Sequence, residues 1–379
     1  MTQVSYPAAF IRGGTSNAVV FRATDLPQDR AAWPALFAAV MGSPDPAMRQ
    51  LNGMGGGNSS LSKVCVVGPP TRSDADVDYT FAQVSITQAT IDLSGNCGNM
   101  SSAIGPFAYD EGMVTAPDGM ATVRIHNTNS GKIIVARFVV KAGRAVVTGD
   151  TAIPGVAGSG APVELAFLDP GDTLGRGTLP AGAAVETLTL LDGTTLRATM
   201  IDAAMPSVFV AASDIGGNAA AHPDAIDRNA ALMARLEEVR VWASQAMGIT
   251  SDAKSAAARI AIPKVAMIAP PAPFRDLSGS MVSTAAHDIA IRMISVGQAH
   301  RAVPVTGALA LACAAAVEGS IVAEMLESDA SQIRIGTPSG VVVVGATPDP
   351  GTGKIASAHI VRTQRRLMDG HVYAPAPPL

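Results

Sequence analysis

The sequence of 379 residues is poor in aromatic residues and has no marked excess of one charge. Aromatic residues make up 4% of it, against 48% hydrophobic residues in all, so we expect aliphatic, alanine-rich cores. There are 27 Lys+Arg and 31 Asp+Glu, which give a net charge of −4 without any block of like charges. Such a chain offers no basic surface to a phosphate backbone, and we expect no nucleic-acid partner.

Long apolar runs and paired metal ligands are also missing. No uninterrupted apolar stretch reaches the ~18–20 residues that span a bilayer, and residues 1–7 lack the basic and apolar parts of a signal peptide. Cys65, Cys97 and Cys313 form no CxxC pair, which argues against a disulfide framework or a structural zinc site. The six histidines are scattered without HExxH spacing. We therefore expect a cytoplasmic protein with no membrane partner and no metal site; a homodimer is possible.

The chain is long enough for two cores, because single cores stop growing near ~250–300 residues. Short β-branched segments occur in both halves, which predicts an α+β fold. The expected strands are 18–21, 64–67, 77–86, 122–126, 133–140, 187–191, 196–200, 207–210, 264–268, 332–335 and 341–344. Helical periodicity appears at 31–40, 225–247, 285–295 and 307–318, with a shorter run at 101–111.

A stretch rich in glycine and proline, Pro154 to Pro180, is the best candidate for a domain junction, and a long surface loop is the alternative. We place the domains at 1–180 and 181–379, with the last strand free to return to the first domain.

One theme occurs in both halves: a loop leads into a helix of small residues. In the first half it is Ser94 to Gly105, and in the second His300 to Ala308 followed by Leu309 to Val317. A helix N-terminus without bulky side chains presents unpaired N–H groups and about half a positive charge, so it can hold a carboxylate. Two such ends facing each other would clamp a multiply charged anion.

Three loops combine glycine with hydroxyl or amide side chains: Arg12 to Asn17, Asn52 to Lys63, and the loop around Cys97. Taken singly, each is best explained as a tight turn; together they indicate a site. The second loop fails the GxxxxGK(S/T) order because Ser62 precedes Lys63, so a P-loop is rejected. A GxGxxG dinucleotide fingerprint is absent as well.

Lys63 and Cys97 are the candidates for chemistry. Lys63 stands between Ser62 and an apolar strand, so it is either a surface lysine with a buried stem or a partly desolvated lysine that exchanges protons with carbon. Cys97 lies at an expected helix N-terminus, a setting that favours a thiolate, or is simply a small buried residue. Burial inside apolar runs suits Cys65 and Cys313 better.

Several strings, in this order, make the chain resemble the PrpF family, which contains methylaconitate isomerase and relatives acting on methylitaconate, oxalomesaconate and aconitate. The strings in the first half are Arg12 to Ser16, Gly53 to Lys63, Asp76 to Tyr79, Phe81 to Val84, Ser94 to Asn99 and Gly105 to Phe107. Those in the second half are Met205-Pro206, Pro263-Lys264, His300 to Ala302, Thr306 to Ala308 and Pro338 to Gly340. The resemblance covers nearly the whole chain and rests on order and spacing.

The resemblance implies a diaminopimelate-epimerase-like fold: two similar domains, each a curled sheet around a central helix, with the active site in the cleft between them. It also implies a cofactor-independent isomerase acting on a di- or tricarboxylate, with Lys63 and Cys97 as catalytic residues. The substrate-binding residues it implies are Thr15, Ser16, Asn17, Gly98, Asn99, His300, Arg301, Thr306, Gly307, Ser339 and Gly340. Arg12, Arg292 and Arg301 are candidates for added positive charge, ranked below the backbone N–H groups. Family members commonly have Lys after the RGGTS string, so Asn17 leaves the substrate open.

The expected reaction is a proton shift along an allylic system. Neutral Lys63 would take a proton from carbon and return it at the other end of the three-carbon unit, while helix N–H groups stabilise the dienolate. A two-cysteine racemase or epimerase on the same fold is the alternative enzyme, although Thr306 to Ala308 stands where its second cysteine would be. A non-catalytic carboxylate-binding protein is the third reading.

Overall fold

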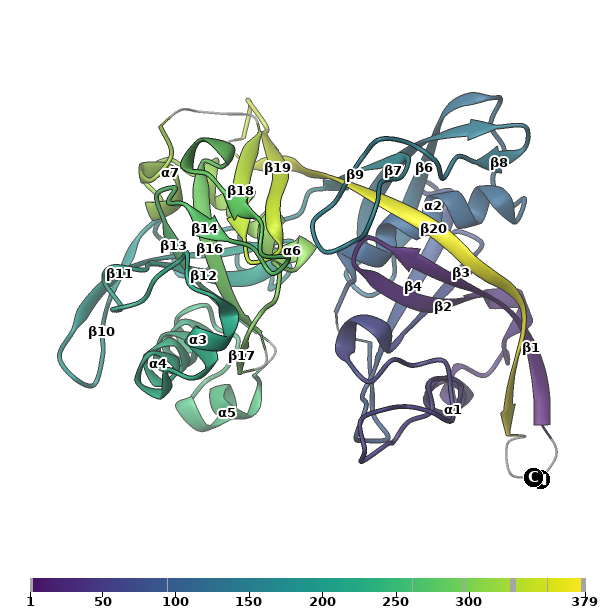
Figure 1. The fold of residues 1–379 in the computed structure, drawn as a ribbon, viewed down its shortest axis with the longest axis horizontal. Helices are drawn as coiled ribbons and strands as arrows, with labels where there is room; N and C mark the ends of the chain where they lie inside the picture. Colours follow the sequence, from purple (N-terminus) through teal and green to yellow (C-terminus); the bar gives the residue numbers. More distant parts are fainter. Residues whose placement is uncertain are drawn as a thin grey trace. The chain divides into compact units, whose positions relative to one another are not determined.

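The computed structural model describes residues 3–93, 95–260, 262–295, 297–327, 332–352 and 354–375 (Figure 1). Its packing defines two compact units. Unit 1 comprises Met1–Ala166 and Val361–Leu379, and unit 2 comprises Phe167–Ile360. The expected domain limit at 180/181 therefore falls inside unit 2, because the strand at Pro162–Leu168 already ends the first unit. Of the described residues, no helix is long and apolar enough to cross a membrane.

Unit 1 is built on eight strands whose pairings form a closed ring. Each strand pairs with the next in the order β1, β2, β3, β4, β6, β7, β9 and β20, and β20 pairs with β1 to close the ring. Their bounds are β1 Gln3–Gly13, β2 Ser16–Arg22, β3 Lys63–Gly68, β4 Val77–Val84, β6 Gly119–Asn127, β7 Lys132–Lys141, β9 Pro162–Leu168 and β20 Ile355–Pro375. Short strands β5 (Ile91–Asp92) and β8 (Arg144–Ala145) extend β4 and β7. The ring leaves a lining face and an outer face.

Helix α2 (Gly98–Asp110) packs against β1, β6, β7 and β8, and its residues from Met100 to Ala108 are all buried. Small residues allow this fit: a Cβ added at Gly105 would lie 2.8 Å from the Phe138 ring. Helix α1 (Trp33–Met41) packs against β2, β3 and β4, in a core that includes Val64 and Val66 of β3. Burial on both faces explains why β3 reads as a continuous apolar run.

Unit 2 has its own sheet. In pairing order the strands are β10 Glu186–Thr189, β11 Thr195–Ala203, β12 Met205–Ala211, β13 Lys264–Ala269, β16 Ile289–Ser295, β18 Ile333–Thr337 and β19 Gly340–Pro348, followed by the start of β20. Helix α6 (Val305–Ala315) contacts β11, β12 and β19. Helix α4 (Ala230–Ala246) packs with the core on the other face, which includes Val265 and Met267. Smaller elements are α3 Pro223–Asp227, α5 Ala253–Ala258, α7 Ile321–Glu324, β14 Phe274–Arg275, β15 Met281–Val282 and β17 Gln298–Ala299.

The two units repeat one strand order. In unit 1, β1–β2 is antiparallel, β2–β3 parallel, β3–β4 antiparallel, β4–β6 parallel and β6–β7 antiparallel, with α2 between β4 and β6 in the chain. In unit 2 the same sequence of pairings runs through β11, β12, β13, β16, β18 and β19, with α6 between β16 and β18. Strands β3 and β13 therefore hold equivalent positions, as do helices α2 and α6.

The expected elements match the structure at most places, with one clear error. Residues 285–295 were expected to be a helix, but Ile289–Ser295 is strand β16. Its apolar spacing suits both periods, and pairing with β13 and β18 decides for the strand. The glycine- and proline-rich stretch 154–180 also contains a strand, β9, that completes the ring of unit 1. Ser94, in the loop before α2, lies outside the described residues.

Candidate active site

Lys63 is the first residue of β3 and is 7% exposed. It lies on the strand face opposite Val64 and Val66, which pack towards α1. Its Nζ donates a 2.6 Å hydrogen bond to Oε1 of Gln83, the residue directly across on β4, and lies 4.9 Å from the centroid of the Phe81 ring. Among the described residues, no carboxylate forms an ion pair with Lys63. The ammonium is thus held by neutral groups only.

Gln83 is itself held in one orientation. Its Nε2 donates 3.0 Å hydrogen bonds to the carbonyl oxygens of Ser59 and Ser62, which turns Oε1 towards Lys63. Sequence reasoning assigned no role to Gln83 or Phe81. The sequence did contain a signal for them, since both belong to a string that carries the family resemblance. They are two positions apart, so they lie on the same face of β4, next to β3.

The glycine-rich loop before Lys63 wraps around a buried side chain. Gln50 is 1% exposed, and its Oε1 accepts hydrogen bonds from the Gly57 N–H at 2.9 Å and the Ser62 hydroxyl at 2.6 Å. A Cβ at Gly55 would lie 2.3 Å from Gln50 Oε1, so the glycine is needed for this contact. In this structure the loop positions Ser62 and the start of β3. This agrees with the explanation of the loop, taken singly, as a tight turn.

Cys97 is the N-cap residue of α2 and is 8% exposed. The first intrahelical bond closes from the Ser101 N–H to the Cys97 carbonyl oxygen at 3.0 Å, which leaves the N–H groups of Gly98, Asn99 and Met100 outside the helical ladder. The adjacent Asn96 Oδ1 is buried and has no hydrogen-bond partner in the described part of the chain. The start of α2 therefore combines a thiol, N–H donors outside the helical ladder and one acceptor without a partner among the described residues.

The Gly13-Gly14 turn between β1 and β2 packs on the first turn of α2. Asn99 Nδ2 donates to Thr15 Oγ1 at 3.1 Å, and the Thr15 N–H donates to Asn99 Oδ1 at 3.3 Å. Gly14 has φ +52°, and a Cβ there would lie 2.2 Å from Asn99 Oδ1. The structure thus brings the first loop and the Cys97 loop together, as the clustering of motifs predicts.

The neighbouring residues of that hairpin have defined partners. Ser16 is buried and pairs with Gly13 in the β1–β2 register, while Asn17 is half-buried opposite Arg12. Arg12 donates to the carbonyl oxygens of Gly14 at 2.9 Å and Thr363 at 3.0 Å. Burial, and then the charge of Arg365, lower the pKa of Arg12. Arg12 fastens the turn to β20, and its role as an added substrate charge stays a prediction.

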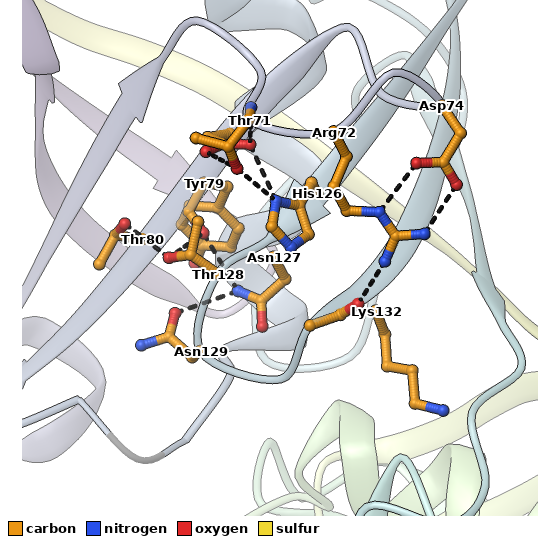
Figure 2. A network of polar contacts seen from close by, with 12 residues as sticks. Thr71, Arg72, Asp74, Tyr79, Thr80, His126, Asn127, Thr128, Asn129 and Lys132 are labelled. Atoms are coloured by element: carbon orange, nitrogen blue, oxygen red, sulfur yellow. Dashed lines mark hydrogen bonds and ion pairs between the residues drawn. The ribbon is translucent and has the colours of Figure 1, made fainter.

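A polar network at the β6–β7 turn is hydrogen-bonded to strand β4 (Figure 2). Asn129 accepts from the Phe81 N–H at 2.8 Å and donates to the carbonyl oxygens of Phe81 at 2.9 Å and Leu93 at 2.7 Å. Asn127 donates to Asn129 Oδ1 at 3.1 Å, which fixes the amide. Asn129 therefore links β4, the strand that pairs with β3 at Lys63, to Leu93 in the segment that precedes Cys97.

Other cysteines have unreactive surroundings. Burial raises the pKa of the Cys65 thiol, and burial raises the pKa of Cys313 to about 12. Both thiols are fully buried, as the sequence indicated. In the ranges that the structure describes, no group of three or more His, Cys, Asp or Glu side chains is placed to hold a metal ion.

In unit 2, Thr306 and Gly307 lie in the first turn of α6, behind the N-cap Pro304. Thr306 is 4% exposed, and its hydroxyl contacts Met205 Sδ at 3.6 Å. The expectation that Cys97 and Thr306 stand at the N-terminal ends of two helices is confirmed, with one helix in each unit. That the two ends face one cleft stays a prediction.

The remaining predicted binding residues form a second group in unit 2. Ser339 Oγ donates to the Arg301 carbonyl oxygen at 2.7 Å, and His300 Nδ1 accepts from the Ala302 N–H at 3.0 Å. Gly340 follows Ser339 in the β18–β19 turn with φ +119°. The structure thus joins the 300–301 loop to the 338–340 turn. Whether these residues bind substrate stays a prediction.

Two arginines that we expected to add positive charge have partners within unit 2. Arg301 forms an exposed ion pair with Asp224. Arg292 is 1% exposed; it donates to the carbonyl oxygen of Ala221 at 2.6 Å and lies 5.0 Å from the Phe274 ring. Burial lowers the pKa of Arg292 to about 10. Whether either guanidinium group also adds charge at the substrate stays a prediction.

Comparisons with known proteins cover almost the whole chain. Residues 3–375 match the family described as PrpF protein. The chain is 38% identical to the 3-methylitaconate isomerase of Eubacterium barkeri, over 98% of this chain and 97% of that protein. It is 39% identical to the 2-methyl-aconitate isomerase of Cupriavidus necator, over 98% of each.

Comparison with solved structures also finds similarity over nearly the whole chain. A methylitaconate-delta-isomerase crystal structure matches with a TM-score of 0.87 at 37% identity, covering 99% of this chain and 96% of that one. A hydroxyproline epimerase from Agrobacterium vitis matches with a TM-score of 0.54 at 12% identity, over 98% and 94%, which indicates a shared fold.

Proposed function

Because the chain belongs to the PrpF family and is an isomerase, we propose that it shifts a proton along the allylic system of an unsaturated di- or tricarboxylate. The observation that carries this proposal is Lys63, a buried lysine held by a neutral amide and an aromatic ring. Methylitaconate, methylaconitate, aconitate and oxalomesaconate are the substrates to test.

The chemistry asks for a base at carbon and for donors where negative charge develops. Removing a proton next to a carboxylate-conjugated double bond gives a dienolate, whose charge must be stabilised. The N–H groups of Gly98, Asn99 and Met100 supply dipoles of the right sign, and Lys63 as the free amine accepts the proton. The hydrogen-bond partner of Lys63, Gln83, is a neutral amide and brings no carboxylate to the amine.

The binding residues form the second part of the proposal. We assign carboxylate binding to the first turns of α2 and α6, with Thr15, Ser16 and Asn17 at the first and His300, Arg301, Ser339 and Gly340 at the second. A crystal structure with a bound, slowly reacting acid tests this assignment. Carboxylate density at only one helix end would reduce the proposal to that end.

The two-cysteine alternative is the weaker candidate. The fold likeness to the hydroxyproline epimerase keeps it in view. Thr306 stands in the first turn of α6, and Cys313 lies fully buried further along the helix. A thiolate pair is therefore missing from these two helix starts, whereas Lys63 is present.

The decisive experiment is an ultraviolet assay of the purified protein with the four acids, followed by deuterium uptake in heavy water. Isomerisation of one of them with deuterium entering the product supports the proposal. Binding of an acid without exchange would indicate a carboxylate-binding protein, and racemisation of an amino acid would favour the epimerase alternative.

A further inference from the structure

Three arginines among the described residues are more than nine-tenths buried, and two of them have a full set of partners. Arg240 is 4% exposed and donates to both carboxylate oxygens of Glu237, at 2.7 and 2.6 Å. Arg292 is 1% exposed and donates to the carbonyl oxygens of Ala221 at 2.6 Å and Gly336 at 3.3 Å. Buried guanidinium groups in this protein are thus normally held by oxygen atoms, as physical chemistry requires.

Arg362, in the part of β20 that belongs to unit 1, is the exception. It is 6% exposed, and its Nη1 donates only to the carbonyl oxygen of the preceding residue, Val361, at 2.9 Å. Its Nε is buried without a hydrogen-bond partner, and no carboxylate in the described ranges forms an ion pair with it. Burial lowers its pKa to about 10. An unpaired charge in such a place is costly, so a partner from outside the chain is expected.

The side chains of β20 on the same face as Arg362 point towards helix α2 (Figure 1). Arg366 forms a 2.7 Å ion pair with Glu111, the C-cap residue of α2, and its guanidinium lies 5.4 Å from the centroid of the Phe107 ring. Side chains two positions apart on a strand share a face, so Gln364 and Arg362 face α2 as Arg366 does.

Arg362 lies at the N-terminal end of that helix. Whereas Arg366 meets the last turn of α2, Gln364 pairs with Gly13 of β1, and a Cβ added at Gly13 would lie 2.8 Å from the Asn99 carbonyl oxygen in the first turn. The step from Arg366 to Gln364 therefore runs from the end of the helix towards its start. Arg362 is two residues, about 7 Å, further in the same direction.

The first turn of α2 adds positive potential of its own. It contains no acidic residue, and the N–H groups of Gly98, Asn99 and Met100 stand outside the helical ladder. A helix N-terminus carries about half a positive charge, and the Arg362 guanidinium brings a whole one to the same end. A carboxylate would satisfy both, because the planar guanidinium fork matches its two oxygens.

We propose that Arg362 binds one carboxylate of the substrate together with the first turn of α2. This inference deepens the proposed function and rests on it. Arg362 carries no proton in the reaction; it fixes the acid in unit 1 and selects substrates that have a carboxylate at this point. All the groups of the site belong to unit 1. Sequence reasoning gave Arg362 no role, because nothing near it in the chain shows that it lacks a partner.

The test separates binding from turnover. Calorimetric titration with tricarballylate, a saturated tricarboxylate that has no allylic system, is carried out on wild type, Arg362→Met and Arg362→Lys. Loss of the guanidinium should raise Kd by at least ~10-fold, and lysine, which keeps the charge without the fork, should raise it less. With the acid that the enzyme isomerises, KM should rise in parallel. Arg365→Met, exposed on the opposite face of β20, is the control and should keep the wild-type Kd.

Melting temperatures without ligand distinguish substrate binding from a structural role. Arg362→Met removes an unpaired buried charge, so it should melt no lower than wild type. A lower melting temperature with an unchanged Kd would make Arg362 a structural residue and overturn the proposal. If the methionine variant does not fold, Arg362→Lys decides, since an unchanged Kd and KM in that variant also overturn it.

Failure of the proposed function has a different signature. If wild type isomerises none of the four acids but binds tricarballylate with an affinity that depends on Arg362, the isomerase proposal fails and the carboxylate site stands. If wild type isomerises an acid and Arg362→Met retains the wild-type Kd and KM, the role of Arg362 alone is overturned. A wild-type protein that binds neither tricarballylate nor any of the four acids overturns both.

Discussion

Units 1 and 2 set a lysine at the same point of the same strand order but surround it differently. In unit 1, Lys63 has an amide and an aromatic ring as neighbours, and Cys97 caps the helix on that face. In unit 2, Lys264 has a hydroxyl, and Thr306 stands in the first turn of the helix. The shared scaffold determines where the amines lie. The side chains on the adjacent strand and at the helix end differ between the two units.

The largest expected effect on activity is that of removing the Lys63 amine from unit 1. Lys63→Met keeps the approximate volume and removes the atom that carries the proton, so kcat should fall by ~10²–10⁴-fold with substrate still bound. Steady-state kinetics with the preferred acid measures this. Cys97→Ser should reduce the rate less, and the exposed Lys141→Met should leave it unchanged. If Cys97→Ser were inactive while Lys63→Met remained active, the Cys97 thiol and not the Lys63 amine would carry the proton.

Changing Gln83, the hydrogen-bond partner of Lys63, should have a smaller effect on the rate. Gln83→Glu places a carboxylate 2.6 Å from Lys63 Nζ if the contact persists, and that charge favours the ammonium over the free amine. We expect the rate at pH 7 to fall by about 10–100-fold and the ascending limb of the pH–rate profile to move to higher pH. The neutral Gln83→Met variant should lose rate without this displacement. Equal pH profiles for both variants would contradict the idea.

The turn that joins the first loop to α2 can be probed by stability. Gly14→Ala combines a positive φ with a collision against Asn99 Oδ1, and we expect it to lower the free energy of unfolding by about 1–3 kcal/mol. Gly143→Ala has a similar φ, +74°, and open space around the added Cβ, so it reports the backbone effect alone. Urea denaturation measures both. If the two losses are equal, the contact with Asn99 contributes nothing.

The smallest effect concerns the buried amine of unit 2. Because the folded pKa of Lys264, about 8, lies below its ordinary value of 10.5, the unfolded chain binds more protons between those pH values and stability rises with pH there. Lys264→Met should remove that rise and increase the free energy of unfolding at pH 7 by on the order of 1–2 kcal/mol, net of the lost bond to Ser295. Urea midpoints at pH 7 and pH 9.5 test it. Parallel pH curves for variant and wild type would contradict it.

Strands and helices of both units could be expected from local patterns, but the equivalence of the two lysines could not. Lys63 was singled out because hydroxyls, amides and glycines precede it in the chain. Lys264 follows a proline and precedes an ordinary apolar strand. Its equivalence to Lys63 is evident only from the pairings of β13 with β12 and β16, which are distant in the sequence. The error at 285–295 has the same origin, since strand pairing outweighs local periodicity.

The sequence by itself determined the family, the two helix starts at Cys97 and Thr306, and the candidate base Lys63, because these depend on residue types and their order. Only the tertiary structure decided that Gln83 and Phe81 hold Lys63, that Asn99 locks the Gly14 turn, and that Arg12 and Arg292 bind carbonyl oxygens. Those contacts join residues that are distant in the chain. A hydrogen bond or a buried charge depends on which atoms meet in space, and the closing of strands into a sheet settles that.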